Sequence, residues 1–395
     1  MSDLEPGQIS RRTFLKRAVA ASGTLALAAA GIRAHQESKE QIQEPDGFIL
    51  LQENSQNGVV LRSLDYRTKN KKDLYSIPVN PSIALNNAAV SPDAKKLVVE
   101  IIDTVSDTSK KLDIVDVQNG QTKQEILLTD QSLSDIQFSP DSKKLFLLSK
   151  QEQPDGSYKS KLDVRDLQDG HVLKTVDIPD QGIYVSINPK DENLILVTSA
   201  NPDMKGSTTR VLDISQPEIQ TISTMDATSG SWSPDGKSIA YQADLDKNGR
   251  PEIYIKDRNG HSQSRTLNFA AYPVWSPDSK SIAFLDDGVP DPMGIDQAVK
   301  KLPDSLRERI ERKFNTDGNA LVSIMNISSG EVTNIGDKWV ENKPLVWLDV
   351  DKVLATEFTG RGNAVFDVSK GGRTPLSKTE VKDNEEILSW HPYTP

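Results

Sequence analysis

The sequence contains no cysteine, and this absence removes several kinds of site. Disulfide bonds, thiolate metal ligands, cysteine nucleophiles and a lipid-modified N-terminal cysteine are all excluded. Histidine is scarce as well, with only His35, His171, His261 and His391. A histidine-based metal site or acid–base pair needs several such side chains to converge, so we interpret His171 and His261, each after a turn glycine, as solvated rim residues.

Motifs of common enzymes are also missing. The sequence has neither a Gly-x-Ser-x-Gly nucleophile elbow nor a Gly-x-x-x-x-Gly-Lys-Ser phosphate loop. Residues 359–366, "TGRGNAVF", hold only two glycines of a dinucleotide-binding fingerprint. Acidic residues also outnumber basic ones, so the formal net charge is −10 and the pI about 5.1. This balance argues against nucleic acid as the main partner.

The N-terminus has the pattern of an export signal. Residues 10–16, "SRRTFLK", resemble the twin-arginine motif through Arg11 and Arg12, and small residues offer cleavage after Ala30 or Ala34. The weakly apolar stretch at 18–32 is about 15 residues long, shorter than the roughly 20 needed to span a bilayer. We therefore predict a twin-arginine signal peptide over residues 1–34, and a periplasmic, extracellular or cell-surface location. An Ala-rich surface helix and an uncleaved weak anchor remain alternatives.

Cleavage of this signal would leave an acidic chain without a stable membrane span. Residues 1–34 carry a net charge of +3, so the mature chain would carry about −13. Residues 35–46, "HQESKEQIQEPD", are polar and charged and predict a flexible linker.

The rest of the chain repeats one phrase. It is clearest as "SWSPDGKSIAYQAD" (residues 231–244) and "VWSPDSKSIAFLDD" (residues 274–287). Counted between the Pro or Asp residues at 92, 140, 189, 234, 277, 349 and 392, the spacings are 48, 49, 45, 43, 72 and 43 residues. A period near 45 is typical of a repeat architecture.

Each repeat reads as four short antiparallel strands. An alternating run ends at an aromatic or aliphatic residue, Ser-Pro-Asp-Gly makes a tight turn, and a β-rich run follows. A third strand then ends at an Asp or Asn before a glycine turn, as in "EIYIKDRNG" (residues 252–260), and a fourth strand completes the unit. Four strands per repeat of this length form a propeller blade.

The ends of the repeat region complement each other. Residues 47–78 are predicted to form the second, third and fourth strands of a blade whose first strand is missing there. Residues 385–392 are predicted to form a first strand that lacks the other three. Pairing them would close the ring and remove two exposed edges. We predict an all-β, seven-bladed propeller over residues 47–395, with six or eight blades as alternatives.

The phrases "WSPDGKSIAY" and "EIYIKDRNG" closely resemble the TolB-like family of β-propellers, whose Pro-Asp repeats are related to WD repeats. The resemblance implies the propeller fold over roughly residues 47–395. It implies little chemistry, because propellers host unrelated functions. TolB itself has an additional N-terminal domain, for which residues 35–46 are too short, so its partner-binding role is not implied.

One loop offers a candidate calcium site. Asp244, Asp246, Asn248 and Gly249 match the first half of an EF-hand-like loop, and Glu252 stands at its ninth position. The twelfth position is occupied by isoleucine, so the bidentate carboxylate is missing. We predict Asp244, Asp246, Asn248 and Glu252 as Ca²⁺ ligands, and a plain polar turn is the alternative.

The long spacing of 72 residues contains an insertion at residues 288–319. Val299, Leu302, Leu306, Ile310 and Phe314 recur at helical intervals and predict two short helices. The helices are expected either to cover the chain's own propeller or to form a docking element or lid.

These observations favour a non-enzymatic binding or scaffold protein for a protein, peptide or envelope polymer. The alternative is a polysaccharide lyase or hydrolase with acidic groups lining the channel, since the first strand of each blade should form the channel wall. A third possibility is a calcium-dependent structural protein of the cell surface.

Overall fold

The computed structural model describes residues 46–153, 158–178, 181–200, 206–216, 219–227, 229–244, 251–259, 261–265, 270–286, 319–335, 340–341, 345–356, 363–369, 373–376, 381 and 385–392. The predicted signal peptide at 1–34 lies outside these residues, as do positions 35–45 of the linker and 288–318 of the insertion. Asn319, the last residue assigned to the insertion, begins a strand instead. None of the described residues forms a helix long and apolar enough to cross a membrane.

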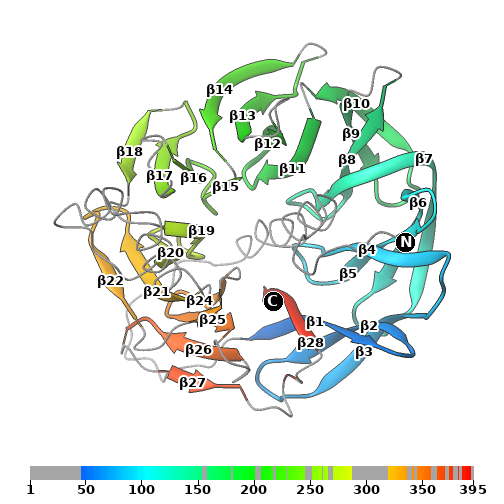
Figure 1. Cartoon of the computed structure of the whole chain (residues 1–395), viewed down its shortest axis with the longest axis horizontal. Coiled ribbons are helices and arrows are strands. Elements are labelled where there is room, and N and C mark those ends of the chain that lie inside the picture. The colour runs from blue at the N-terminus through cyan, green and yellow to red at the C-terminus, as the bar shows by residue number, and fades with distance from the viewer. Residues whose placement is uncertain are drawn as a thin grey trace, which may run out of the picture.

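The chain forms a seven-bladed β-propeller of four-stranded antiparallel sheets, as predicted, and the described residues contain no helix (Figure 1). The strands of the first three blades run as follows from the centre outward. Blade one has β28 (Glu385–Pro392), β1 (Gly47–Ser55), β2 (Gly58–Asp65) and β3 (Lys71–Pro78). Blade two has β4 (Ile83–Val90), β5 (Lys96–Asp103), β6 (Thr108–Asp116) and the first part of β7 (Thr122–Phe138). Blade three has the second part of β7, β8 (Lys144–Glu152), β9 (Tyr158–Asp166) and β10 (Val172–Ile178).

The other four blades repeat this order. Blade four has β11 (Gln181–Asn188), β12 (Asp191–Ala200), β13 (Ser207–Asp213) and β14 (Gln220–Asp226). Blade five has β15 (Ser229–Trp232), β16 (Ser238–Ala243), β17 (Glu252–Asp257) and β18 (Ser262–Arg265). Blade six has β19 (Ala270–Trp275), β20 (Ser281–Asp286), β21 (Asn319–Asn326) and β22 (Val332–Asn334), with β23 (Val340–Glu341) also on β21. Blade seven has β24 (Val346–Asp349), β25 (Lys352–Thr356), β26 (Asn363–Asp367) and β27 (Arg373–Pro375).

The ring closes through the C-terminal strand, as the sequence predicted. β28 pairs antiparallel with β1, so the last strand of the chain is the innermost strand of the first blade (Figure 1). The carboxylate of Glu385 is fully buried there and forms ion pairs with Arg62 on β2, at 3.2 Å, and Lys71 on β3, at 2.5 Å. Closure therefore combines a sheet ladder with buried charge pairing.

The core consists of seven apolar clusters, one at each interface between neighbouring blades. This follows from the strands, whose apolar side chains point alternately to the two faces of each blade. Val99 packs with blade one, for example, whereas Val98 packs with blade three. Each blade is therefore held by both neighbours.

Candidate functional site

The Ser-Pro-Asp turns join the first and second strands and share one set of hydrogen bonds. In blade five, Ser233 Oγ donates to Asp235 Oδ1 at 2.6 Å and accepts from the Ser238 backbone N–H at 2.9 Å. Blades two, three and six repeat this geometry. In an antiparallel blade the turns between the third and fourth strands emerge on the same side. We call this side the turn face.

The fourth residue of these turns has a left-handed backbone. Its φ is 57° at Ala94, 61° at Ser142, 71° at Gly236 and 61° at Ser279. The two serines also bond to the preceding blade, because the Asp93 N–H donates to Ser142 Oγ at 3.1 Å and the Asp235 N–H to Ser279 Oγ at 3.0 Å. The turns therefore connect neighbouring blades.

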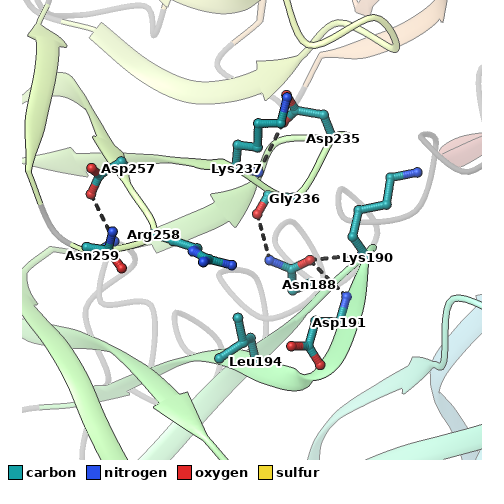
Figure 2. Close-up of a pocket in the computed structure, with 10 residues that line it drawn as sticks. All are labelled: Asn188, Lys190, Asp191, Leu194, Asp235, Gly236, Lys237, Asp257, Arg258 and Asn259. Carbon is teal, nitrogen blue, oxygen red and sulfur yellow. Dashed lines mark hydrogen bonds and ion pairs between the residues drawn. The ribbon is translucent and has the colours of Figure 1, made fainter.

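A cavity of about 570 Å³ opens on the turn face between blades four and five (Figure 2). Its walls come from the β11–β12 turn, the β15–β16 turn and the β17–β18 turn, and Leu194 on β12 contributes an apolar surface. Figure 2 shows Arg258 reaching from the β17–β18 turn toward Asn188, whereas the side chain of Lys190, on the other wall, points away from Arg258.

Glycine at position 236 makes room for this arrangement. A Cβ atom there would lie 2.5 Å from Asn188 Oδ1, far inside van der Waals contact. Asn188 Nδ2 donates instead to the Gly236 carbonyl at 2.9 Å, so a side chain of blade four makes the contact between blades. Trp232, in the apolar cluster of the same blade interface, has a buried Nε1–H without a hydrogen-bond partner in the described part of the chain. The equivalent Trp275 and Trp347 donate to carbonyls of the preceding blade at 3.2 and 2.9 Å.

Arg258 departs from a pattern that every other blade keeps. It follows the Asp or Asn that ends the third strand, and in all seven blades this residue's N–H donates to a carbonyl at the start of the second strand. In the other six blades its side chain is apolar and packs, buried or partly buried, against the preceding blade. These residues are Tyr66, Val117, Leu167, Ile214, Ile327 and Val368. Arg258 is exposed, so the crevice that an apolar side chain fills elsewhere stays open.

Lys190 reverses the charge of another repeat position. Counted from the turn proline, it occupies the place that Asp93, Asp141, Asp235 and Asp278 hold in their blades. Asn188 takes over the local hydrogen bonding, because its Oδ1 accepts from the Lys190 N–H at 2.8 Å. The lysine is thus unnecessary for the turn.

The acidic residues of the cavity are already engaged, whereas two cations are not. Asp191 accepts from Asn193, and Asp257 accepts from the N–H groups of Asn259 and His261. Within the described residues, the Lys190 and Arg258 side chains have no hydrogen-bond or ion-pair partner. Lys237 approaches Asp235 only at 3.7 Å, with both side chains exposed, a contact that contributes little.

A second cluster of polar groups lies within the channel wall. Glu100 on β5 is buried and accepts hydrogen bonds from Asn86 at 2.9 Å, Asn87 at 2.5 Å and Ser109 at 2.5 Å. Asp135 on β7 is also buried, and its Oδ2 accepts from the Val185 N–H of the next blade at 2.9 Å. Burial raises the pKa of both carboxyl groups, to about 7 for Asp135. Asp135 therefore connects two blades, whereas the groups that bond to Glu100 belong to its own blade.

The side chains that the described inner strands expose are mostly neutral. Asn86 is exposed, and Asn87, Ile183, Ser231 and Tyr272 are partly exposed. The ionisable Asp135 and Tyr184 on inner strands are buried.

The predicted calcium residues fall only partly within the described chain. Asp246 and Asn248 lie outside it. Ala243 pairs with Glu252 in the β16–β17 ladder, so Asp244 and Glu252 flank the base of the loop. Tyr254 Oη donates to Glu252 Oε2 at 2.7 Å. Among the described residues there is no group of three or more potential metal ligands.

The histidines occupy two environments. His171 and His261 are exposed on turns, as predicted, and His261 Nδ1 lies 2.9 Å from Asp257 Oδ2. His391 is buried on β28, where desolvation lowers its pKa to about 3, and its Nε2 lies 2.5 Å from Ser389 Oγ. His35 lies outside the described residues. The three described histidines therefore do not meet in one site.

The cavity was not predicted from the sequence, although a signal for it was present. Aligning the seven repeats would have shown Lys190 in an aspartate position and Arg258 in an apolar position. What the alignment lacks is the knowledge that the two positions face each other across one blade interface.

Residues 116–279, less than half of the chain, match the model of a family described as the YqgU-like 6-bladed beta propeller domain. The match runs from the end of β6 to the β19–β20 turn, whereas the whole ring has seven blades. A search of the curated proteins finds no match.

Solved structures share the fold at low sequence identity. The uncharacterized protein lmo1340 from Listeria monocytogenes EGD-e is 10% identical with a TM-score of 0.58, covering 87% of this chain and 97% of that one. A functionally unknown protein from Desulfotomaculum acetoxidans DSM 771 is 16% identical with a TM-score of 0.53, covering 87% and 99%. A chain of the mitotic checkpoint complex, 13% identical with a TM-score of 0.52, covers 85% and 97%. At these identities the likeness concerns the fold alone.

Proposed function

We propose that this chain is an exported, TolB-like β-propeller that acts as a non-enzymatic binding protein, with the cavity between blades four and five as its binding site. The proposed partner is a protein, a peptide or a polymer of the cell envelope. One observation carries the proposal: Lys190 and Arg258 each depart from the residues that other blades hold at their positions, and both line the same cavity.

The physical argument uses the other blades as internal references. An apolar residue at position 258 would bury surface against blade four, as its six equivalents do, and would add about 1–2 kcal/mol to the free energy of unfolding. The unpaired Trp232 Nε1–H costs a further hydrogen bond at this interface. Positions that depart from the sequence pattern of a fold are commonly functional. An open cavity lined by cations without ion-pair partners among the described residues favours a binding function.

The enzyme alternative needs acidic groups that a polysaccharide can reach. Two acids with a raised pKa, Glu100 and Asp135, are both buried. Glu100 is hydrogen-bonded within its own blade, and Asp135 to the next blade. A general acid must lie within hydrogen-bond reach of its substrate, so binding is the better supported function.

Export by the twin-arginine pathway to the periplasm or cell surface is part of this proposal and depends on Arg11 and Arg12. Replacing both with lysine should leave the full-length precursor inside the cell, as detected by fractionation and immunoblotting. Normal export of the double variant would contradict this part of the proposal and leave the binding site untouched.

The binding site is tested by restoring the repeat. Residues 35–395 are immobilised as wild type, as Arg258→Leu, and as Lys143→Gln, a matched lysine on the turn of blade three. Each is incubated with an envelope extract of the source organism, and captured species are purified and titrated individually. We expect Arg258→Leu to melt at or above the wild-type temperature and to lose at least about tenfold in affinity, while Lys143→Gln binds normally. Equal binding by all three proteins, or no captured species, would overturn the proposal.

A further inference from the structure

We infer that the cavity between blades four and five recognises a single carboxylate carried on a peptide chain, held by the Arg258 guanidinium, while Lys190 on the other wall adds positive charge at longer range. This inference rests on the proposed binding function and specifies its ligand. It is carried by the charges that the cavity leaves unsatisfied.

The cavity offers positive charge because its acids are engaged by the protein itself. Asp191, Asp235 and Asp257 accept backbone N–H groups at 2.9 to 3.1 Å within their own turns. In the described part of the chain, Lys190 and Arg258 have no such partner. An incoming anion therefore meets a guanidinium at Arg258 that does not have to break an existing ion pair, and a guanidinium can hold a carboxylate through two parallel hydrogen bonds.

The surroundings favour one negative charge over many. The three cations Lys190, Lys237 and Arg258 are balanced by the three aspartates, and the remainder of the protein is acidic. A polymer with a charge on every unit, such as a polyuronate, would place further anions against these aspartates and against the negative field of the molecule. A single carboxylate flanked by neutral groups avoids this repulsion.

The neutral groups of the cavity suit a peptide. Asn259 is exposed at the edge, and its side-chain amide, which has no partner within the described residues, offers both a donor and an acceptor to a peptide group. Leu194 adds apolar contact. The volume of about 570 Å³ lies within the range of about 300–1,000 Å³ typical of ligand pockets, so the cavity fits a short segment.

The probes are two bead-bound libraries of acetylated and amidated pentapeptides. One library has Glu at the central position and the other has Gln, and the four flanking positions carry only uncharged residues. The full mature protein is passed over both, and its retention is measured for wild type, Arg258→Gln and Lys190→Gln. Lys143→Gln and Lys280→Gln remove the same charge from exposed turn lysines elsewhere on the turn face and serve as matched controls.

We expect wild type to be retained about tenfold more strongly by the Glu library. Arg258→Gln should abolish this preference, Lys190→Gln should reduce it, and the two controls should keep it. Equal retention by both libraries that Arg258→Leu still removes would overturn the carboxylate while leaving the proposed binding site standing. Retention that Arg258→Leu leaves unchanged would overturn both proposals.

Free competitors separate the sources of an anion. A pentapeptide from the Glu library should displace the bound protein, whereas oligogalacturonate and inorganic phosphate at equal charge concentration should not. Displacement by either of these at lower concentration than the peptide would overturn the inference in favour of a uronate or phosphate site.

Discussion

At the scale of the residue, the fourth position of the Ser-Pro-Asp turn links sequence to assembly. The turn requires a left-handed backbone there, which costs a non-glycine residue about 1–2 kcal/mol. Ser142 and Ser279 offset part of this cost by accepting a hydrogen bond from the preceding blade. Gly236 avoids the cost and leaves room for Asn188.

Glycine 236 should therefore be more sensitive than a glycine with equal backbone geometry and free space. Gly330 has φ 69° and no atom within 4 Å of the place that an added Cβ would occupy, against φ 71° and a contact of 2.5 Å at Gly236. We expect Gly330→Ala to lower the free energy of unfolding by about 1 kcal/mol and Gly236→Ala by at least about 1 kcal/mol more. Urea denaturation measures both. Equal losses would show that the Asn188 contact contributes nothing.

Asp135 should make stability depend on pH. Its pKa rises from 3.8 to about 7 on burial, so between these values the folded state holds a proton that the unfolded state lacks. The stabilising contribution is complete below about pH 4 and is lost as pH rises through 7, by at most about 1.4 kcal/mol per pH unit.

This sign is tested with Asp135→Asn, which stays neutral. Urea denaturation at pH 5 and pH 8 should show that wild type loses about 1–3 kcal/mol more than the variant over this interval. The difference between the proteins is the readout, since His391 and the surface groups titrate in both. Parallel losses would contradict the raised pKa.

At the scale of the element, the features that distinguish one blade from another lie in the connections between strands. Alternating apolar residues and turn residues determine where the four strands of a blade lie. Six blades also have an apolar residue at the position that Arg258 occupies in blade five. The sequence predicts a calcium loop in the connection between β16 and β17 and a helical insertion in the one between β20 and β21. Both remain predictions that the described residues do not test.

The β16–β17 connection is predicted to bind calcium through Asp244, Asp246, Asn248 and Glu252. Millimolar Ca²⁺ should raise the melting temperature by roughly 2–5 °C, because a ligand that binds only the folded state stabilises it. Mg²⁺ serves as the control ion, and Asp244→Ala/Asp246→Ala as the control variant. No shift with Ca²⁺, or the same shift in the variant, would leave a plain polar turn.

The insertion before β21 is predicted to cover the propeller with the apolar stripe of its helices. Deleting residues 290–317 should then lower the free energy of unfolding by several kcal/mol, about 1.5–3 kcal/mol for each large side chain exposed, without changing partner affinity. Calorimetry and titration of the captured partner measure the two effects. Unchanged stability with lost affinity would identify a docking element instead.

At the scale of the whole molecule, the ring depends on one strand from the far end of the chain. β28 contacts β1 along its length, and the adjoining Phe48, Ile49, Leu50 and Leu51 are fully buried. Without β28 these residues would face solvent and β1 would present an unpaired edge.

Ending the chain at Asn384 should therefore abolish a single cooperative melting transition, as followed by circular dichroism, and adding a peptide of residues 385–395 should restore it. Ending the chain at Pro392 removes only the last three residues and is the control, with no expected change. A cooperative transition in the longer truncation would show that closure is not required for folding.

The sequence by itself determined the class of fold and the strand that closes the ring, because these depend on local turn chemistry and alternation repeated along the chain. It predicted seven blades but left six or eight as alternatives. It also identified His171 and His261 as exposed turn residues. Only the tertiary structure decided that Lys190, Gly236 and Arg258 line one cavity, since they come from three turns of two blades and their arrangement depends on how the blades pack. The burial of Glu100, Asp135 and His391 was decided in the same way, because an isolated strand does not reveal what its neighbour covers.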